Sequence, residues 1–178
     1  RTYTEMQKDP RIGKVAVQVL EDTPITMTRN RAVQIARDGG YDMVLMLDSD
    51  NQPDSELKSD PSAKPFWKTS FDFAYERLLR GIPSVVCAPY CGKPPHENVF
   101  CFFWEQHENS PHGSFSLEPY SRHVAATMTG IQPIAAGPTG VTLYTTNAFD
   151  LMDPPYFYYE YKDEPYQTEK ASTEDVTN

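Results

Sequence analysis

Hydrophobic residues along the chain fall into short runs that predict alternating strands and helices. The run Val15–Leu20 is rich in β-branched residues and predicts a strand. Thr28 is placed to cap a helix whose apolar residues recur at helical spacing until Gly39 and Gly40, which are suited to end it. Met43–Leu47 is apolar throughout, which is typical of a strand buried on both faces in a parallel sheet. Strand, helix and buried strand in this order predict a βαβ unit.

The rest of the chain continues this alternation with less regularity. A helix is expected across residues 71–79 and Gly81 is placed to end it. Prolines and polar residues predict a loop at 51–65, and residues 105–122 are expected to be loop because they lack periodicity. Further strands are expected at 82–88, 99–104 and 141–146, with a short helix at 147–152. The tyrosine- and proline-rich segment Pro154–Tyr166 leaves two interpretations open, a lid that stacks on sugar rings or a loop packed by its own side chains. No repeat or linker divides the chain, so residues 1–178 are expected to form one α/β domain.

Composition narrows the class of partner. Hydrophobic residues make up 39% and charged residues 23%, which is ordinary for a globular protein. The net charge of -9 and the absence of a Lys/Arg cluster argue against a protein that holds nucleic acid by its phosphates. The three cysteines, an odd number, argue against a disulfide framework and favour a reducing compartment, so the cytoplasm is the expected location. No apolar run approaches the roughly 20 residues of a membrane-spanning helix.

The candidate chemistry lies directly after the apolar run that ends at Leu47. There the sequence reads Asp48-Ser49-Asp50, and ligands of open α/β sheets bind beyond the carboxyl ends of strands. Two carboxylates one residue apart can hold Mg²⁺ or Mn²⁺, so Asp48 and Asp50 are candidate metal ligands. Such an ion would neutralise a diphosphate and stabilise it as a leaving group. The alternative is a plain surface turn, because Asp, Ser and Asn all favour turns.

Several motifs, in a consistent order and spacing, carry a resemblance to a known family. They are Thr28–Val33, Gly40–Asp42, Met46–Asp50, Gly137–Leu143, Phe149–Met152 and Thr173–Val176. Together they resemble the GT-A fold glycosyltransferases of the family-2 type over residues 13–178. The resemblance implies a Rossmann-like α/β domain with a mixed, mainly parallel sheet flanked by helices. The family's first strand would lie before Arg1 and a histidine metal ligand beyond Asn178, so the domain is expected to be incomplete at both ends.

The resemblance also implies an activity. A metal-dependent hexosyltransferase would move a sugar from a UDP- or GDP-sugar to a hydroxyl acceptor, with inversion and with Mn²⁺ or Mg²⁺ as cofactor. Asp48 and Asp50 would hold the metal, Asp175 would take the proton of the acceptor hydroxyl, and Glu174 would assist it. The residues expected to bind substrate are Arg29, Asp48, Ser49, Gly137 and Gly140, with Arg29 near the diphosphate and the glycines letting the backbone pass close to donor or acceptor.

Alternatives remain open for each of these assignments. Arg29 could pair with Glu21 or Asp22 on the surface, and Glu174 and Asp175 could form the first turn of an ordinary helix. Gly137 and Gly140 could be turn glycines. At the level of function, the alternatives are a nucleotidyltransferase of related fold and a non-enzymatic, metal-dependent carbohydrate-binding module, which would need the acidic turn but neither Arg29 nor Asp175.

Overall fold

A three-stranded sheet forms the centre of the molecule. The computed structural model describes residues 2–54, 64–91, 99–106 and 115–159. The strands are β1 (Met43–Leu47), β2 (Val85–Cys87) and β5 (Val141–Thr145), in the order β1-β5-β2. Strand β5 runs antiparallel to both neighbours, with Leu143 opposite Leu45 on one side and Val86 on the other. The two outer strands therefore point the same way, and their carboxyl ends lie at the end of the sheet where β5 begins.

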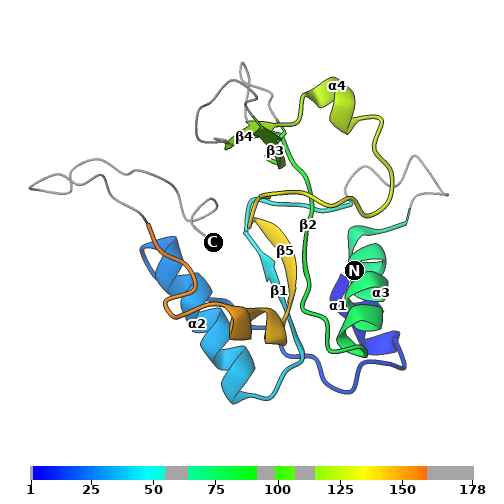
Figure 1. Cartoon of the computed structure of the whole chain (residues 1–178). Helices are drawn as coiled ribbons and strands as arrows, with labels where there is room; N and C mark the ends of the chain where they lie inside the picture. The colour runs from blue at the N-terminus through cyan, green and yellow to red at the C-terminus, as the bar shows by residue number, and fades with distance from the viewer. Residues whose placement is uncertain (1, 55–63, 92–98, 107–114, 160–178) are drawn as a thin grey trace, which may run out of the picture.

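Helices cover the two faces of this sheet (Figure 1). Helix α2 (Ile25–Asp38) packs on one face, where Val44 and Met46 of β1 point toward it, and α3 (Phe66–Leu78) packs on the other, where Met43 and Leu45 point. This division follows from the alternation of side chains along a strand. The remaining elements are α1 (Thr2–Lys8), α4 (Arg122–Ala125), the 3₁₀ helix η2 (Thr146–Leu151), and an antiparallel hairpin of β3 (Phe102–Gln106) and β4 (Phe115–Pro119).

The expectation of a mainly parallel, Rossmann-like sheet is wrong. Every adjacent pair of strands in the described residues is antiparallel, in the central sheet and in the hairpin alike. The βαβ unit fails for a related reason, since residues 12–22 have no regular secondary structure and Val17 and Val19 are 66% and 81% exposed. β-Branched side chains favour an extended backbone, but a strand also needs a partner that accepts its hydrogen bonds, and Val15–Leu20 has no ladder in the described structure.

Both long helices end at glycine, as the sequence predicts. Gly40 and Gly81 have positive φ angles of 65° and 71°, a conformation that glycine adopts without steric cost. In each case the next residue reaches back, so the N–H of Tyr41 donates to Ala36 at 2.9 Å and that of Ile82 to Arg77 at 2.9 Å. These bonds satisfy the last carbonyls and turn the chain toward β1 and β2.

Helix α2 begins earlier than its sequence predicts. It starts at Ile25 after Pro24, and Thr28 lies inside the first turn rather than at the cap. Proline suits a helix start because the first N–H groups have no intrahelical partner. The Thr28 hydroxyl instead donates to the Asp22 carbonyl at 2.7 Å, which fixes the entry of the chain into the helix.

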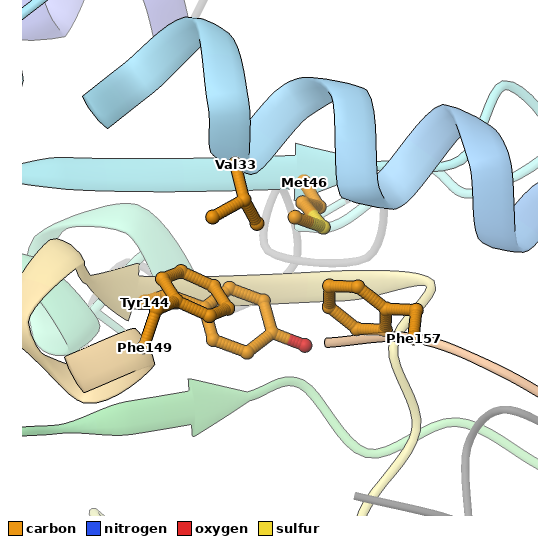
Figure 2. Close-up of a cluster of buried hydrophobic side chains, with 5 residues drawn as sticks. All are labelled: Val33, Met46, Tyr144, Phe149 and Phe157. Carbon is orange, nitrogen blue, oxygen red and sulfur yellow. The ribbon is translucent and has the colours of Figure 1, made fainter. Parts of the chain in front are cut away.

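The core on the α2 face joins residues from distant parts of the chain. Val33, Met46, Tyr144, Phe149 and Phe157 form one buried cluster, shown in Figure 2. Burying each such side chain contributes roughly 1.5–3 kcal/mol. Phe157 is 3% exposed, so the described part of the tyrosine-rich segment packs into the core at this position.

Asn30 of α2 fastens that segment in place. Its side-chain oxygen accepts from the backbone N–H groups of Tyr156 at 2.8 Å and Phe157 at 3.2 Å, and its nitrogen donates to the Phe157 carbonyl at 2.7 Å. One side chain thus satisfies three backbone groups that packing removes from water.

None of the helices in the described ranges is long and apolar enough to cross a lipid bilayer.

Candidate functional site

The acidic turn continues the pairing of β1 with β5. Its residues, Asp48 to Asn51, follow directly after Leu47, and the N–H of Asp48 donates to the Gly140 carbonyl at 2.8 Å. The N–H of Asn51 then donates to the Asp48 carbonyl at 3.0 Å, which closes the turn. The turn and the start of β5 therefore run side by side at the end of the sheet nearest the hairpin (Figure 1).

Arg29 reaches this turn from the middle of α2. Its guanidinium Nη2 lies 3.3 Å from Oδ2 of Asp48, and the two side chains are 6% and 33% exposed. A largely buried guanidinium needs carboxylate or carbonyl partners, because an ionised group taken out of water without them is strongly destabilised. The structure thus brings together the residue expected near a diphosphate and a residue expected to hold a metal.

The surface pairing that was the alternative for Arg29 is made by a different arginine. Asp22 lies 3.3 Å from Nη1 of Arg31, whose side chain is 59% exposed. Arg29 and Arg31 differ in this because residues two apart on a helix point in different directions. Arg29 faces the sheet, and Arg31 faces outward.

Asp50 and Ser49 occupy the tip of the turn and are exposed to solvent. The Asn51 side-chain nitrogen donates to Asp50 Oδ1 at 3.4 Å. Asp48 contacts Arg29, whereas the Asp50 side chain contacts Asn51. Within the described ranges, no three His, Cys, Asp or Glu side chains converge on a possible metal position. An ion held by two carboxylates would need further ligands such as phosphate oxygens and water.

Gly140 allows the acidic turn to pack against β5. A Cβ atom at this position would lie 2.6 Å from the Asn51 side-chain nitrogen and 3.0 Å from the Tyr90 hydroxyl oxygen. Gly137 meets a similar restriction, because a Cβ there would collide with the Cys87 sulfur and lie 2.7 Å from Cδ1 of Ile134. At both positions a larger residue would displace the neighbouring side chains, so the glycines serve close packing inside the protein.

Tyr90 and Asn51 are site residues that the sequence analysis missed. Tyr90 follows β2, and its ring packs edge-on against Phe100 with centroids 5.6 Å apart. Its hydroxyl oxygen and the Asn51 side-chain nitrogen both border Gly140, within 3.0 Å of the position that a Cβ atom there would take. Tyr90 lies near the acidic turn because the carboxyl ends of β1 and β2 share one end of the sheet. Finding it from the sequence would have required knowing that these two strands point the same way.

Glu174 and Asp175, the expected catalytic pair, lie outside the described residues, as does the end of Pro154–Tyr166. The site that the structure does describe therefore consists of Arg29, Asp48, Ser49, Asp50, Asn51, Tyr90, Gly137 and Gly140. We call these residues the acidic-turn site.

Comparisons with known proteins add no further constraint on the acidic-turn site. No known family model, curated protein or solved structure matches the chain. Its function has to be argued from the site itself.

Proposed function

We propose that the protein is a metal-dependent glycosyltransferase that uses a nucleoside-diphosphate sugar as donor and a hydroxyl compound as acceptor. The observation that carries the proposal is the contact of the buried Arg29 with Asp48, at the carboxyl end of β1 and beside the exposed Asp50. The proposal is supported by a cationic side chain of α2 that contacts one carboxylate of the turn, with a second carboxylate two residues along the chain. A divalent cation offsets the charge of a diphosphate, so carboxylates can hold the cation while an arginine donates hydrogen bonds to the phosphate oxygens.

The residues divide the work of binding and transfer. Asp48 and Asp50 would hold Mn²⁺ or Mg²⁺, which supplies electrostatic stabilisation of the departing diphosphate. Arg29 would bind the phosphates, and Tyr90 and Asn51 would contact the sugar from the side of Gly140. Asp175, aided by Glu174, would take the proton of the acceptor hydroxyl as its oxygen attacks the anomeric carbon and the bond to the diphosphate breaks.

The proposal extends to the setting of the protein. The three cysteines are free thiols, which fits a reducing compartment such as the cytoplasm. The partners are a UDP- or GDP-sugar and a hydroxyl-bearing acceptor, and no nucleic acid is involved.

Binding of nucleotides with and without metal tests the proposal. UDP, GDP and a nucleoside triphosphate are titrated calorimetrically in the presence and absence of Mn²⁺. We expect nucleoside diphosphate binding that requires Mn²⁺ and is weakened by Asp50→Ala at least about 10-fold, because even the loss of a group that only supports a metal ligand costs about 10–100-fold. Asp42→Ala is the matched control, because Asp42 is an exposed aspartate at the opposite end of β1.

The other functions predict different results in the same titration. Preference for the triphosphate would indicate nucleotidyl transfer, and binding of sugars with metal but without nucleotide would indicate a carbohydrate-binding module. Absence of nucleotide binding in the folded protein would overturn the glycosyltransferase proposal.

Transfer itself tests the role of Asp175. Asp175→Asn keeps the shape of the side chain but removes the base, so donor binding should survive while transfer falls by roughly 100-fold or more. The rate of transfer is measured with UDP- and GDP-sugars and a hydroxyl acceptor, by coupled detection of the nucleoside diphosphate that transfer releases. Unchanged transfer would show that the base is another residue.

A further inference from the structure

Two cysteines meet at the junction of the central sheet and the hairpin. Cys87 is the last residue of β2, and Cys101 directly precedes β3. The antiparallel pairing of Phe102 with Ala136 sets Cys101 opposite Gly137, and the Cys87 sulfur fills the space that a Cβ atom of Gly137 would occupy, so the two cysteines are neighbours. Cys101 is 8% exposed, Cys87 is half-buried, and the third cysteine, Cys91, is exposed.

The interaction between the two cysteines makes their thiols unequal. Interaction with Cys101, together with burial, raises the pKa of the Cys87 thiol. The same interaction lowers the pKa of the Cys101 thiol, which favours its thiolate. Thiol–disulfide exchange proceeds through the thiolate, so the arrangement supplies a nucleophile with a second thiol next to it.

The segment that leads into the acidic-turn site packs directly on this pair. Gly137 has no room for a Cβ atom because the Cys87 sulfur occupies the space. The N–H of Phe102, the neighbour of Cys101, donates to the Ala136 carbonyl at 2.9 Å. Residues 135–137 therefore pack against Cys87 and against the neighbour of Cys101. Gly140 of the acidic-turn site follows three residues after Gly137.

We propose that Cys87 and Cys101 form a reversible thiol-modification site, which a small oxidised disulfide such as glutathione disulfide converts to an intramolecular disulfide. The thiolate attacks one sulfur of glutathione disulfide and releases one glutathione thiolate. The second cysteine then loses its proton and attacks the mixed disulfide, which releases the second glutathione. The protein gives up two electrons and two protons, and one glutathione disulfide becomes two glutathione molecules.

Oxidation would alter the packing under Gly137. Two neighbouring sulfurs must approach to about 2 Å when they are joined covalently. This would draw the end of β2 toward the start of β3 and link the two sheets. The inference does not rest on the proposed glycosyl transfer, because the cysteines and the packing stand whatever the acidic-turn site binds.

Peptide mapping of the oxidised protein tests the inference. The folded chain is equilibrated with glutathione disulfide, quenched in acid, unfolded and labelled with a maleimide. We expect labelled thiols to fall from three per chain to one, with the label on Cys91 and a linked peptide that contains Cys87 and Cys101. Dithiothreitol should restore all three thiols. The midpoint of thermal unfolding should rise by on the order of 5 °C on oxidation, since the link restrains the unfolded chain.

Two variants define the specificity of the reaction. Cys91→Ser, at the exposed cysteine, should still form the bond, and Cys101→Ser should not. A disulfide that involves Cys91, a glutathione adduct without an internal bond, or three labelled thiols after oxidation would each overturn the proposal. The wild-type map decides the question even if Cys101→Ser does not fold.

Discussion

Strands β1 and β5 lie side by side, and the less hydrophobic strand, β5, is the more deeply buried of the two. Strand β1 reads Met-Val-Leu-Met-Leu, and only Met46 is buried, while Leu47 is 51% exposed. Strand β5 reads Val-Thr-Leu-Tyr-Thr and is buried at every position. The more apolar strand is thus the more exposed one.

The difference comes from position in the sheet. Strand β5 is hydrogen-bonded along both edges, to β1 and to β2, whereas β1 has a strand partner along one edge only in the described structure. A central strand is shielded by its neighbours as well as by the helices on both faces, and this shields even threonine. Burial of a strand therefore follows from how many of its sides are covered rather than from its own composition.

The same substitution in the two strands should give the largest contrast. Leu143→Ala removes a side chain that is 1% exposed and packs with Trp67 and Phe71, so we expect a loss of about 2–5 kcal/mol in the free energy of unfolding. Leu47→Ala is the matched control, with an expected loss of about 1 kcal/mol or less, because half of that side chain already contacts water. Urea unfolding with linear extrapolation measures both.

Equal losses at the two leucines would break the comparison. They would mean that the outer edge of β1 is covered in solution, by a segment that the structure does not describe or by another molecule.

A smaller loss in the free energy of unfolding is expected when a buried hydroxyl group of the central strand β5 is removed. The Thr145 hydroxyl accepts from the Ser84 N–H at 2.8 Å and donates to the Ser84 carbonyl at 3.2 Å, in a fully buried setting. Thr145→Val keeps the shape but leaves the Ser84 N–H without this acceptor, which should cost about 1–3 kcal/mol.

Thr127→Val provides the exposed counterpart to that substitution. The Thr127 hydroxyl donates to the Val124 carbonyl at 2.7 Å at the protein surface, where water can replace it. The free energy of unfolding should change by about 0.5 kcal/mol or less. A similar loss for both variants would show that burial does not decide the strength of these hydrogen bonds.

The smallest effect concerns the link that holds the α1 region to α3, the helix over the Leu143 face. Arg11 pairs with Asp9 and, at 2.8 Å, with Asp72 of α3, and its guanidinium lies over the Phe71 ring. The hydrogen bond from Arg11 lowers the pKa of Asp9 from 3.8 to about 2.

A lowered pKa means that ionised Asp9 stabilises the folded state. This contribution is complete above about pH 4 and is lost as the pH falls from the unfolded value toward 2. For a partly exposed pair it amounts to about 1 kcal/mol at most. Asp9→Asn should therefore reduce the stability at pH 7 and make no difference near pH 2, as pH-dependent thermal unfolding would show. A constant difference across this range would exclude the ion pair as its cause.

Local elements were predictable from sequence because local interactions determine them. The bounds of β1 and the glycine ends of α2 and α3 follow from apolar runs and backbone freedom, and the structure confirms them. The strand order was not predictable in the same way, because the late strand β5 enters between two earlier ones. The hairpin strand β4 was missed since residues 105–122 lack periodicity, and its stability comes from pairing with β3.

The candidate site likewise has features that are visible in the sequence and features that depend on how the elements pack. A carboxylate pair after an apolar strand is visible in the sequence, and so are the glycines at 137 and 140. The contact of Arg29 with Asp48 depends on the packing of α2 against β1, and the position of Tyr90 depends on the direction of β2. Neither can be read from spacing along the chain.

The central place of β5 has a consequence for synthesis of the protein. As the chain leaves the ribosome, β1 and β2 emerge long before the strand that joins them. Leu143 is the shared partner of Leu45 and Val86, so neither outer strand can complete its native ladder until translation has passed residue 145. Contacts this distant in sequence form slowly, because a long loop must close first. The unfinished chain must therefore carry the apolar segment Met43–Leu47 without its native partner, and during that interval it is open to chaperones and to aggregation.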